Sequence, residues 1–324
     1  MTSKAFGLAQ LGNAYADGAL SNRNLIINGN FIVSQRGDYT SSSSPSDGDF
    51  TVDRWQVIQD GSPSTALIQN TDGSMKLTAG AATTGSMRLR QKFEYNLFPR
   101  QYDNKTFILS AKIKSNSQNA RLNVYAGGYL AVSGVTSHSG SDQYETLTAI
   151  FTTPATITTE FSVHIGIDGV NSANTAISNG DYFEVKEVQL EAGDTATPFE
   201  HRSYGQELAL CQRYYWRNDA EGPSDFNNLG VGVVADSNVV FISVNLPQKM
   251  RAQPSLFYSS LSDLRTTTVF GGGGGTPTSV VLGYNHTIRP TLYVTGPGGQ
   301  TFGQSRLFGF SETTTGWIAF DAEL

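Results

Sequence analysis

Residues 106–114 read TFILSAKIK, and residues 161–167 read FSVHIGI. In both stretches every second residue is apolar, counting from Phe107 in the first and from Phe161 in the second. Successive side chains of a strand point to opposite faces of a sheet, so this alternation predicts strands with one face on a core and the other in water.

Short apolar stretches of this kind recur from residue 25 to about residue 200, separated by turns rich in Gly, Asn, Ser and Pro. Asn28-Gly29 is a strong turn signal, because Asn and Gly tolerate the positive φ angles of tight turns. Leu25–Ile27 and Phe50–Ile58 are expected as strands on either side of the first loop. With no helical pattern between the strands, the region predicts an antiparallel β-sandwich.

One convincing helix is predicted over Tyr204–Trp216. Ser203 and Gln206 have the spacing of a capping box, in which each side chain satisfies an unpaired backbone N–H group. The helix has apolar residues on two faces, which suggests burial against more than one surface. Leu208, Cys211 and Tyr215 lie on one face, and Leu210 and Tyr214 on a second.

These patterns divide the chain into four parts. Residues 1–24 form a glycine-rich leader, residues 25–200 the β-sandwich, residues 201–217 a linking helix, and residues 218–324 a smaller C-terminal β domain. The predicted fold class is therefore all-β with one short linking helix.

Composition excludes several classes of protein. The 324 residues carry 22 Lys and Arg against 28 Asp and Glu, for a net charge of −6, which argues against a nucleic-acid partner. Cys211 is the one cysteine, so neither an internal disulfide nor a cysteine-based metal site is expected. No apolar stretch approaches the length of a membrane span, so no membrane insertion is expected.

No catalytic motif emerges, and we expect no catalytic residue, no metal ligand and no cofactor. Gly271–Gly275 lacks the Lys-Ser/Thr pair of a phosphate-binding loop. His164 is expected in solvent on the wet side of its strand. A structural calcium ion remains an alternative, because four carboxylates that could ligate it lie close together in the sequence near the first loop: Asp38, Asp47, Asp49 and Asp53.

Aromatic residues with polar neighbours are the feature that points to a ligand. A sugar ring has apolar C–H faces and a polar rim, so a surface that binds sugars combines aromatic rings with hydrogen-bonding side chains. Tyr125 and Tyr129 flank Gly127-Gly128, where the backbone can approach a ligand closely. Tyr95, Tyr125 and Tyr129 are therefore carbohydrate-stacking candidates; alternatively, such rings fill the sandwich. Trp55 is expected in the core.

Several segments carry a family resemblance. NLIINGNF (24–31), QRG (35–37) and VDRW (52–55) resemble the opening of a module in tail-fibre and other virion proteins of tailed bacteriophages. VQLEAGDTATPFEHRSY (188–204), running into ELALCQRYY (207–215), resembles the same family's junction, and LSAKIK (109–114) resembles a strand of carbohydrate-binding jelly-roll modules. The resemblance implies a jelly-roll fold, a virion location and a homotrimer, and it carries no catalytic residues.

The helix offers a physical route to a trimer. Leu208, Cys211 and Tyr215 of three copies are expected to pack against one another around an axis. The alternative is that the helix packs onto its own C-terminal sheet. Trimerisation would let weak sugar contacts act together.

The function predicted from the sequence is that of a structural virion protein, a trimeric tail fibre or tail-tip adhesin that binds host surface polysaccharide without catalysis. Residues 1–24 are expected to contact another virion protein. The alternatives are a capsid-attached fibre or decoration protein of the same fold, a glycan depolymerase, and a bacterial surface lectin.

Overall fold

The computed structural model describes residues 23–61, 63, 65–96, 101–220, 228–268, 274–296, 300–311 and 315–324. Almost all of the predicted leader (1–24) and most of Gly271–Gly275 lie outside these residues. The chain divides into two compact units, the first reaching to Glu207 and the second covering Leu208–Glu323. The described chain is mostly strand with one α-helix, which confirms the predicted fold class.

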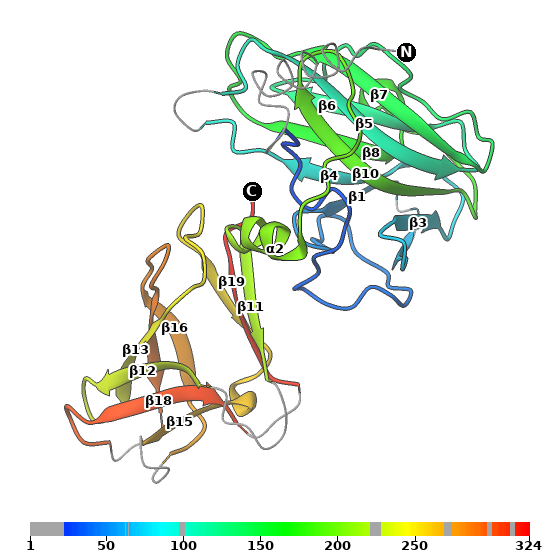
Figure 1. Ribbon diagram of the computed structural model, residues 1–324. Coiled ribbons are helices and arrows are strands. Elements are labelled where there is room, and N and C mark those ends of the chain that lie inside the picture. The colour runs from blue at the N-terminus through cyan, green and yellow to red at the C-terminus, as the bar shows by residue number, and fades with distance from the viewer. Residues whose placement is uncertain are drawn as a thin grey trace, which may run out of the picture. The chain divides into compact units, whose positions relative to one another are not determined.

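The N-terminal unit is an antiparallel jelly-roll sandwich of two sheets (Figure 1). The first sheet has the order β1-β4-β8-β6, with β9 paired to β4. Its strands are β1 (Gln56–Asp60), β4 (Thr83–Lys92), β6 (Ala120–Ala126), β8 (Phe161–Ile167) and β9 (Thr175–Ile177). A 3-10 turn (Val170–Ser172) precedes β9.

The second sheet of this unit has the order β2-β3-β10-β5-β7, and Figure 1 shows β10, β5 and β7 side by side. Its strands are β2 (Thr65–Gln69), β3 (Met75–Ala79), β5 (Thr106–Ser115), β7 (Tyr144–Thr152) and β10 (Tyr182–Ala192). The predicted strand over 106–114 is therefore a central strand of this sheet.

The core lies between the two sheets and is rich in aromatic rings. Phe161 of β8 stacks on Phe93 with ring centroids 4.7 Å apart and also contacts Phe107 of β5. Trp55 is fully buried, as expected, and its indole N–H donates to the carbonyl oxygen of Asn28. The prediction of a wet outer face was wrong for β8, since all seven residues of this strand are buried.

The opening segment is a turn held by side chains. Leu25–Ile27 does not form a strand, and the strand predicted over Phe50–Ile58 begins only at Gln56. Asn28 adopts a positive φ of 58°, and its amide donates to the carbonyl oxygens of Val33 (2.8 Å) and Asp53 (2.9 Å). In a strand, these two carbonyl oxygens would be paired with the backbone of a neighbouring strand. Here the Asn28 side chain satisfies them instead.

Helix α2 (Tyr204–Gln212) begins at the predicted capping box. The backbone N–H of Ser203 donates to Oε1 of Gln206 (3.0 Å), and the N–H of Gln206 donates to Oγ of Ser203 (3.4 Å). The predicted extension to Trp216 was wrong. Tyr215 is the first residue of strand β11 (Tyr215–Asp219) and does not lie on the helix.

The helix ends early because aromatic residues favour a strand once a partner strand is present. Tyr215 pairs with Asp321 and Trp216 with Phe320 across an antiparallel ladder, and the Trp216 and Phe320 rings lie 5.9 Å apart.

The C-terminal unit contains two antiparallel sheets, of order β11-β19-β14 and β15-β18-β12-β13-β17-β16. Their remaining strands are β12 (Asn228–Val234), β13 (Val239–Val244), β14 (Ser255–Tyr258), β15 (Leu264–Thr268), β16 (Ser279–Tyr284), β17 (Thr291–Thr295), β18 (Ser305–Phe310) and β19 (Trp317–Asp321), with a 3-10 turn at Leu261–Asp263. Ile242, Phe308 and Phe320 are fully buried in its core. Within the residues described, no helix is both long enough and apolar enough to cross a membrane.

Candidate functional site

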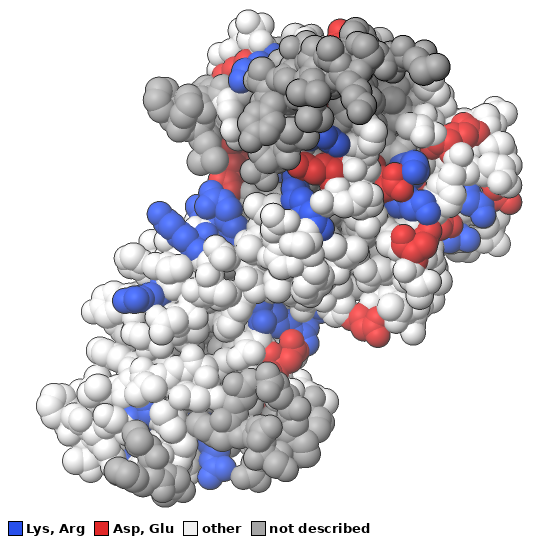
Figure 2. Space-filling view, viewed as in Figure 1, with Lys and Arg blue, Asp and Glu red and all other residues white. Residues whose placement is uncertain are grey.

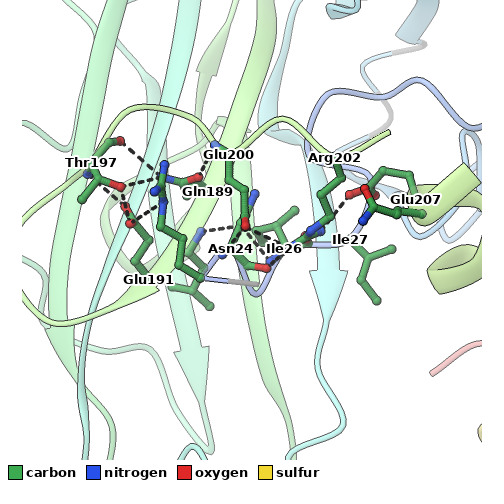
Figure 3. A network of polar contacts seen from close by, with 12 residues as sticks. Asn24, Ile26, Ile27, Gln189, Glu191, Thr197, Glu200, Arg202 and Glu207 are labelled. Carbon is green, nitrogen blue, oxygen red and sulfur yellow. Dashed lines mark hydrogen bonds and ion pairs between the residues drawn. The ribbon is translucent and has the colours of Figure 1, made fainter. Parts of the chain in front are cut away.

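Residues 24–26 and the segment 189–207 are joined by a buried polar network, shown in Figure 3. Arg202 lies at one end of this network. Its Nη1 forms an ion pair with Oε1 of Glu207 (2.7 Å) and donates to the carbonyl oxygen of Ile26 (3.0 Å), and its Nη2 donates to the carbonyl oxygen of Asn24. We call Asn24, Gln189, Glu191, Glu200, Arg202 and Glu207 the polar clasp.

Asn24 is the second centre of the clasp. Its backbone N–H donates to Glu200 Oε2 (2.9 Å) and its amide donates to the carbonyl oxygen of Val188 (3.1 Å), while its side-chain oxygen accepts from the N–H of Leu190. These contacts satisfy buried backbone groups between sequence-distant segments. The polar clasp therefore holds residues 24–26 against β10 and the segment that follows it.

A surface with ligand-binding chemistry lies on the outer face of the first sheet. Across this sheet, Tyr125, Ser162 and Lys92 form one lateral row of opposed residues. Asn123, His164, Arg90 and Gln56 form the next row. We call the outward-facing set the basic–aromatic face: Gln56, Arg88, Arg90, Lys92, Arg121, Tyr125, Tyr129, Glu160 and His164.

The structure brings two of the three predicted stacking residues together. The rings of Tyr125 and Tyr129 lie 5.2 Å apart at 82° to one another, and both are half-buried. Gly127 between them has a φ of +73°, a conformation that favours glycine and reverses the chain so that Tyr129 folds back over the sheet. Tyr95 lies at the same end of the sheet, with its hydroxyl 3.5 Å from the carbonyl oxygen of Thr158.

Charged and amide groups surround these rings. Nε and Nη2 of Arg90 donate to Oε1 of Gln56 at 3.1 and 2.5 Å. Lys92 lies 3.1 Å and Arg90 3.7 Å from the Glu160 carboxylate. Burial lowers the pKa of Arg90, although a guanidinium stays charged in proteins. The face thus presents hydrogen-bond donors and acceptors beside two aromatic edges.

His164 is buried beneath Tyr129, so the prediction that it lies in solvent was wrong. It is 4% exposed because arginine side chains and the returning Tyr129 segment cover the outer side of β8. Burial, reinforced by Arg88, Arg90 and Lys92, holds the pKa of His164 well below its ordinary value. Its Nε2 lies 2.9 Å from the Ser162 hydroxyl, which itself donates to Glu160 (2.7 Å).

The first-loop carboxylates act as hydrogen-bond acceptors. Asp53 accepts from the backbone and the side chain of Gln35, and Asp47 accepts from the backbone N–H of Gln59 (2.8 Å). In the described ranges no group of three or more His, Cys, Asp or Glu side chains could hold a metal ion.

A concave site that sequence patterns did not indicate lies on the second sheet. A hollow of about 460 Å³ is lined by Ser110, Ala111, Lys112, Thr146, Glu187, Thr197, Pro198, Phe199 and His201. Figure 2 shows positive and negative side chains close together over the sheet that contains β5, β7 and β10. One of its lining residues, Glu187, lies within a β-bulge of β10, and the strand pattern of the sequence gives no sign of this bulge.

The predicted trimer residues differ in exposure within a single chain. Leu208 is half-buried, whereas Cys211 (0% exposed) and Tyr215 (5%) are buried. In the C-terminal unit, a row of partly exposed apolar residues crosses four strands, and we call it the C-terminal apolar row: Val233, Phe241, Tyr293 and Val281. The rings of Phe241 and Tyr293 stack at 4.4 Å.

Solved structures of carbohydrate-binding modules are similar to the chain at 11–15% identity. No family model and no curated protein matches the chain. Among solved structures it is similar to a CBM4 structure (14% identity, 51% of this chain and 98% of that chain, TM-score 0.29). It is also similar to the family 11 carbohydrate-binding module of the cellulosomal cellulase Lic26A-Cel5E of Clostridium thermocellum (15% identity, 49% of this chain and 99% of that chain, TM-score 0.28). A third similar structure is the N-terminal CBM22-1–CBM22-2 tandem domain of Paenibacillus barcinonensis Xyn10C (11% identity, 90% of this chain and 98% of that chain, TM-score 0.28).

Proposed function

We propose that the N-terminal unit binds a glycan through the basic–aromatic face, without catalysis. The observation that carries this proposal is the perpendicular pair of Tyr125 and Tyr129 beside Arg90, Gln56 and Lys92. Aromatic rings provide an apolar surface for the C–H faces of a sugar. The neighbouring guanidinium, amide and ammonium groups can donate to its hydroxyls, and Glu160 can accept from them.

The larger role that we propose is that of a trimeric virion protein of a tailed bacteriophage, a tail fibre or tail-tip adhesin. Its support is the resemblance of residues 24–31 and 188–204 to phage virion modules. Residues 1–24 would attach the chain to another virion protein, and the glycan would belong to the host surface. A partly exposed sugar site of this kind binds weakly, and three copies held together would raise the avidity.

The trimer contact would use Leu208 together with apolar surface of the C-terminal unit. Cys211 and Tyr215 offer little area to another copy, because they are already buried inside one chain. The C-terminal apolar row carries no charged residue and presents Val233 and Val281 about half exposed, as an interface between identical copies would require.

A binding experiment tests the glycan proposal. The purified chain is applied to an array of bacterial surface polysaccharides beside the double variant Tyr125→Ala/Tyr129→Ala. A matched control is Phe302→Ala, which removes an exposed ring (78% exposed) in the other unit. We expect the parent chain and the control to bind the same polysaccharide and the double variant to lose this signal. Equal binding by all three proteins would contradict the proposal.

A further inference from the structure

The hollow on the second sheet has the dimensions and lining of a small-ligand site. Its volume of about 460 Å³ falls within the roughly 300–1,000 Å³ that is typical of such sites. Its floor is formed by β5, β7 and β10, and one wall is the segment 197–201 that follows β10. The basic–aromatic face belongs to the other sheet of the sandwich, so the two surfaces are separate.

A β-bulge places the charged group of the hollow. The register of β10 against β5 shifts between Lys186 and Gln189, and Glu187 within the bulge has a φ of 54°. Positive φ is uncommon for a residue other than glycine, and bulges re-aim side chains at functional positions. Here the bulge brings the carboxylate of Glu187 to 2.7 Å from the Lys112 ammonium on the neighbouring strand.

The wall of the hollow is fixed by the polar clasp, as Figure 3 shows. Glu191 accepts hydrogen bonds from the backbone N–H (3.1 Å) and the hydroxyl (2.5 Å) of Thr197. Gln189 accepts from the N–H of Glu200 (2.8 Å) and donates to the carbonyl oxygen of Thr197 (3.2 Å). Because both of these anchoring side chains are buried, the wall is in place before any ligand arrives, which lowers the entropic cost of binding.

The lining combines rings, hydroxyls and one ion pair. Phe199 and His201 meet edge to face, with ring centroids 4.9 Å apart. Ser110 and Thr146 contribute hydroxyls from β5 and β7. Lys112 can donate to one sugar hydroxyl while Glu187 accepts from the next, because the two groups lie as close together as neighbouring hydroxyls on a ring.

We propose that this hollow is a second carbohydrate site, which takes an uncharged hexose unit with adjacent hydroxyl groups. Lys112 and Glu187 neutralise each other, so the hollow offers no excess positive charge to a uronic acid. The hexose would contact Phe199 or His201 through its C–H face and the ion pair through its hydroxyls. Since Tyr125 and Tyr129 take no part, this site stands or fails independently of the basic–aromatic face.

The test uses saturation-transfer NMR on the full chain, with the methyl glycosides of glucose, galactose and mannose as probes. Lys112→Met removes the ammonium group from the hollow. Lys114→Met is the matched control, because Lys114 lies two residues further along the same strand, outside the lining, with its carboxylate partner 3.9 Å away. Glu187→Gln removes the charge and keeps the side-chain shape.

We expect at least one glycoside to receive saturation from the parent chain, from Lys114→Met and from Tyr125→Ala/Tyr129→Ala. Lys112→Met and Glu187→Gln should bind it about tenfold more weakly, since each loses a charged hydrogen bond. The proposal is overturned if no glycoside receives saturation from the parent chain, or if Lys112→Met, still folded by its circular-dichroism melt, binds like Lys114→Met. Preferential binding of methyl glucuronide would overturn the assignment to an uncharged sugar.

Discussion

The phenol ring of Tyr129 stands edge-on against the imidazole of His164, with ring centroids 5.6 Å apart and planes at 87°. Tyr129 comes from the chain reversal after β6, and His164 from the middle of β8. The contact fixes one ring of the proposed sugar site on a buried strand. The basic–aromatic face is therefore supported from beneath by the sandwich itself.

The burial of His164 predicts a stability that depends on pH. The folded-state pKa lies well below the ordinary value of about 6.5, so below that pH the unfolded chain takes up a proton that the folded chain does not. Stability is thus fully present above about pH 6.5 and falls as the pH drops below it, by at most about 1.4 kcal/mol per pH unit for this one group. Urea unfolding measured from about pH 7.5 to about pH 5.5, one unit above and below the ordinary value, should show the fall, and His164→Gln should flatten it. Parallel pH dependences for the two proteins would contradict this assignment.

The ion pair of Arg202 and Glu207 predicts a strong effect on folding. Both side chains are less than a tenth exposed, and removing one partner of a buried pair typically costs about 3–5 kcal/mol. Arg202→Ala should lower the melting temperature of the N-terminal unit markedly. Lys114→Ala, which breaks a partly exposed pair with Asp142 at 3.9 Å, should cost about 0–1 kcal/mol. Similar losses in both variants would show that the clasp does not stabilise the fold.

Gly127 and Gly128 form a matched pair for testing the chain reversal. Gly127 has a φ of +73°, whereas Gly128 has no such constraint and open space around its Cα. Gly127→Ala should cost about 1–2 kcal/mol and weaken glycan binding by shifting Tyr129, whereas Gly128→Ala should leave both stability and binding close to the parent values. Chemical unfolding and array binding check the two effects together.

The proposed trimer predicts a mass in solution close to three times the 34.9 kDa of one chain, measured by light scattering at micromolar concentration. Phe241→Glu places a charge in the middle of the C-terminal apolar row and should shift the mass towards that of a single chain. A monomeric parent chain would contradict the trimer, and a trimer unaffected by Phe241→Glu would move the contact away from this row.

The sequence indicated the sandwich, because apolar and polar residues alternate along a strand that has one face on the core, as in β5. The same pattern wrongly placed the second face of β8 in solvent, because arginine side chains and Tyr129, from another part of the chain, cover that face. The capping box at Ser203 was predicted correctly. The end of the helix was predicted at Trp216, whereas the helix ends at Gln212. Tyr215 joins a strand whose partner, Asp321, lies far away in the sequence.

The candidate sites were predictable only in part. Tyr125 and Tyr129 flank two glycines in the sequence, so their proximity could be expected from a local turn. Glu187 and Lys112 are far apart in the sequence and meet through a bulge, beside which the backbone N–H of Val188 donates to the carbonyl oxygen of Gly29 (2.9 Å). The basic–aromatic face likewise depends on the register of four strands, and a single sequence does not reveal that register.

The most direct test of glycan binding by the N-terminal unit is a titration of the chain with the purified bacterial surface polysaccharide that gives the strongest array signal, comparing the Kd of the parent with that of Tyr125→Ala/Tyr129→Ala. Loss of two stacking rings is expected to raise the Kd at least about tenfold in a variant whose circular-dichroism spectrum still matches that of the parent. An unchanged Kd, or no binding of the polysaccharide by the parent chain, would contradict the central claim.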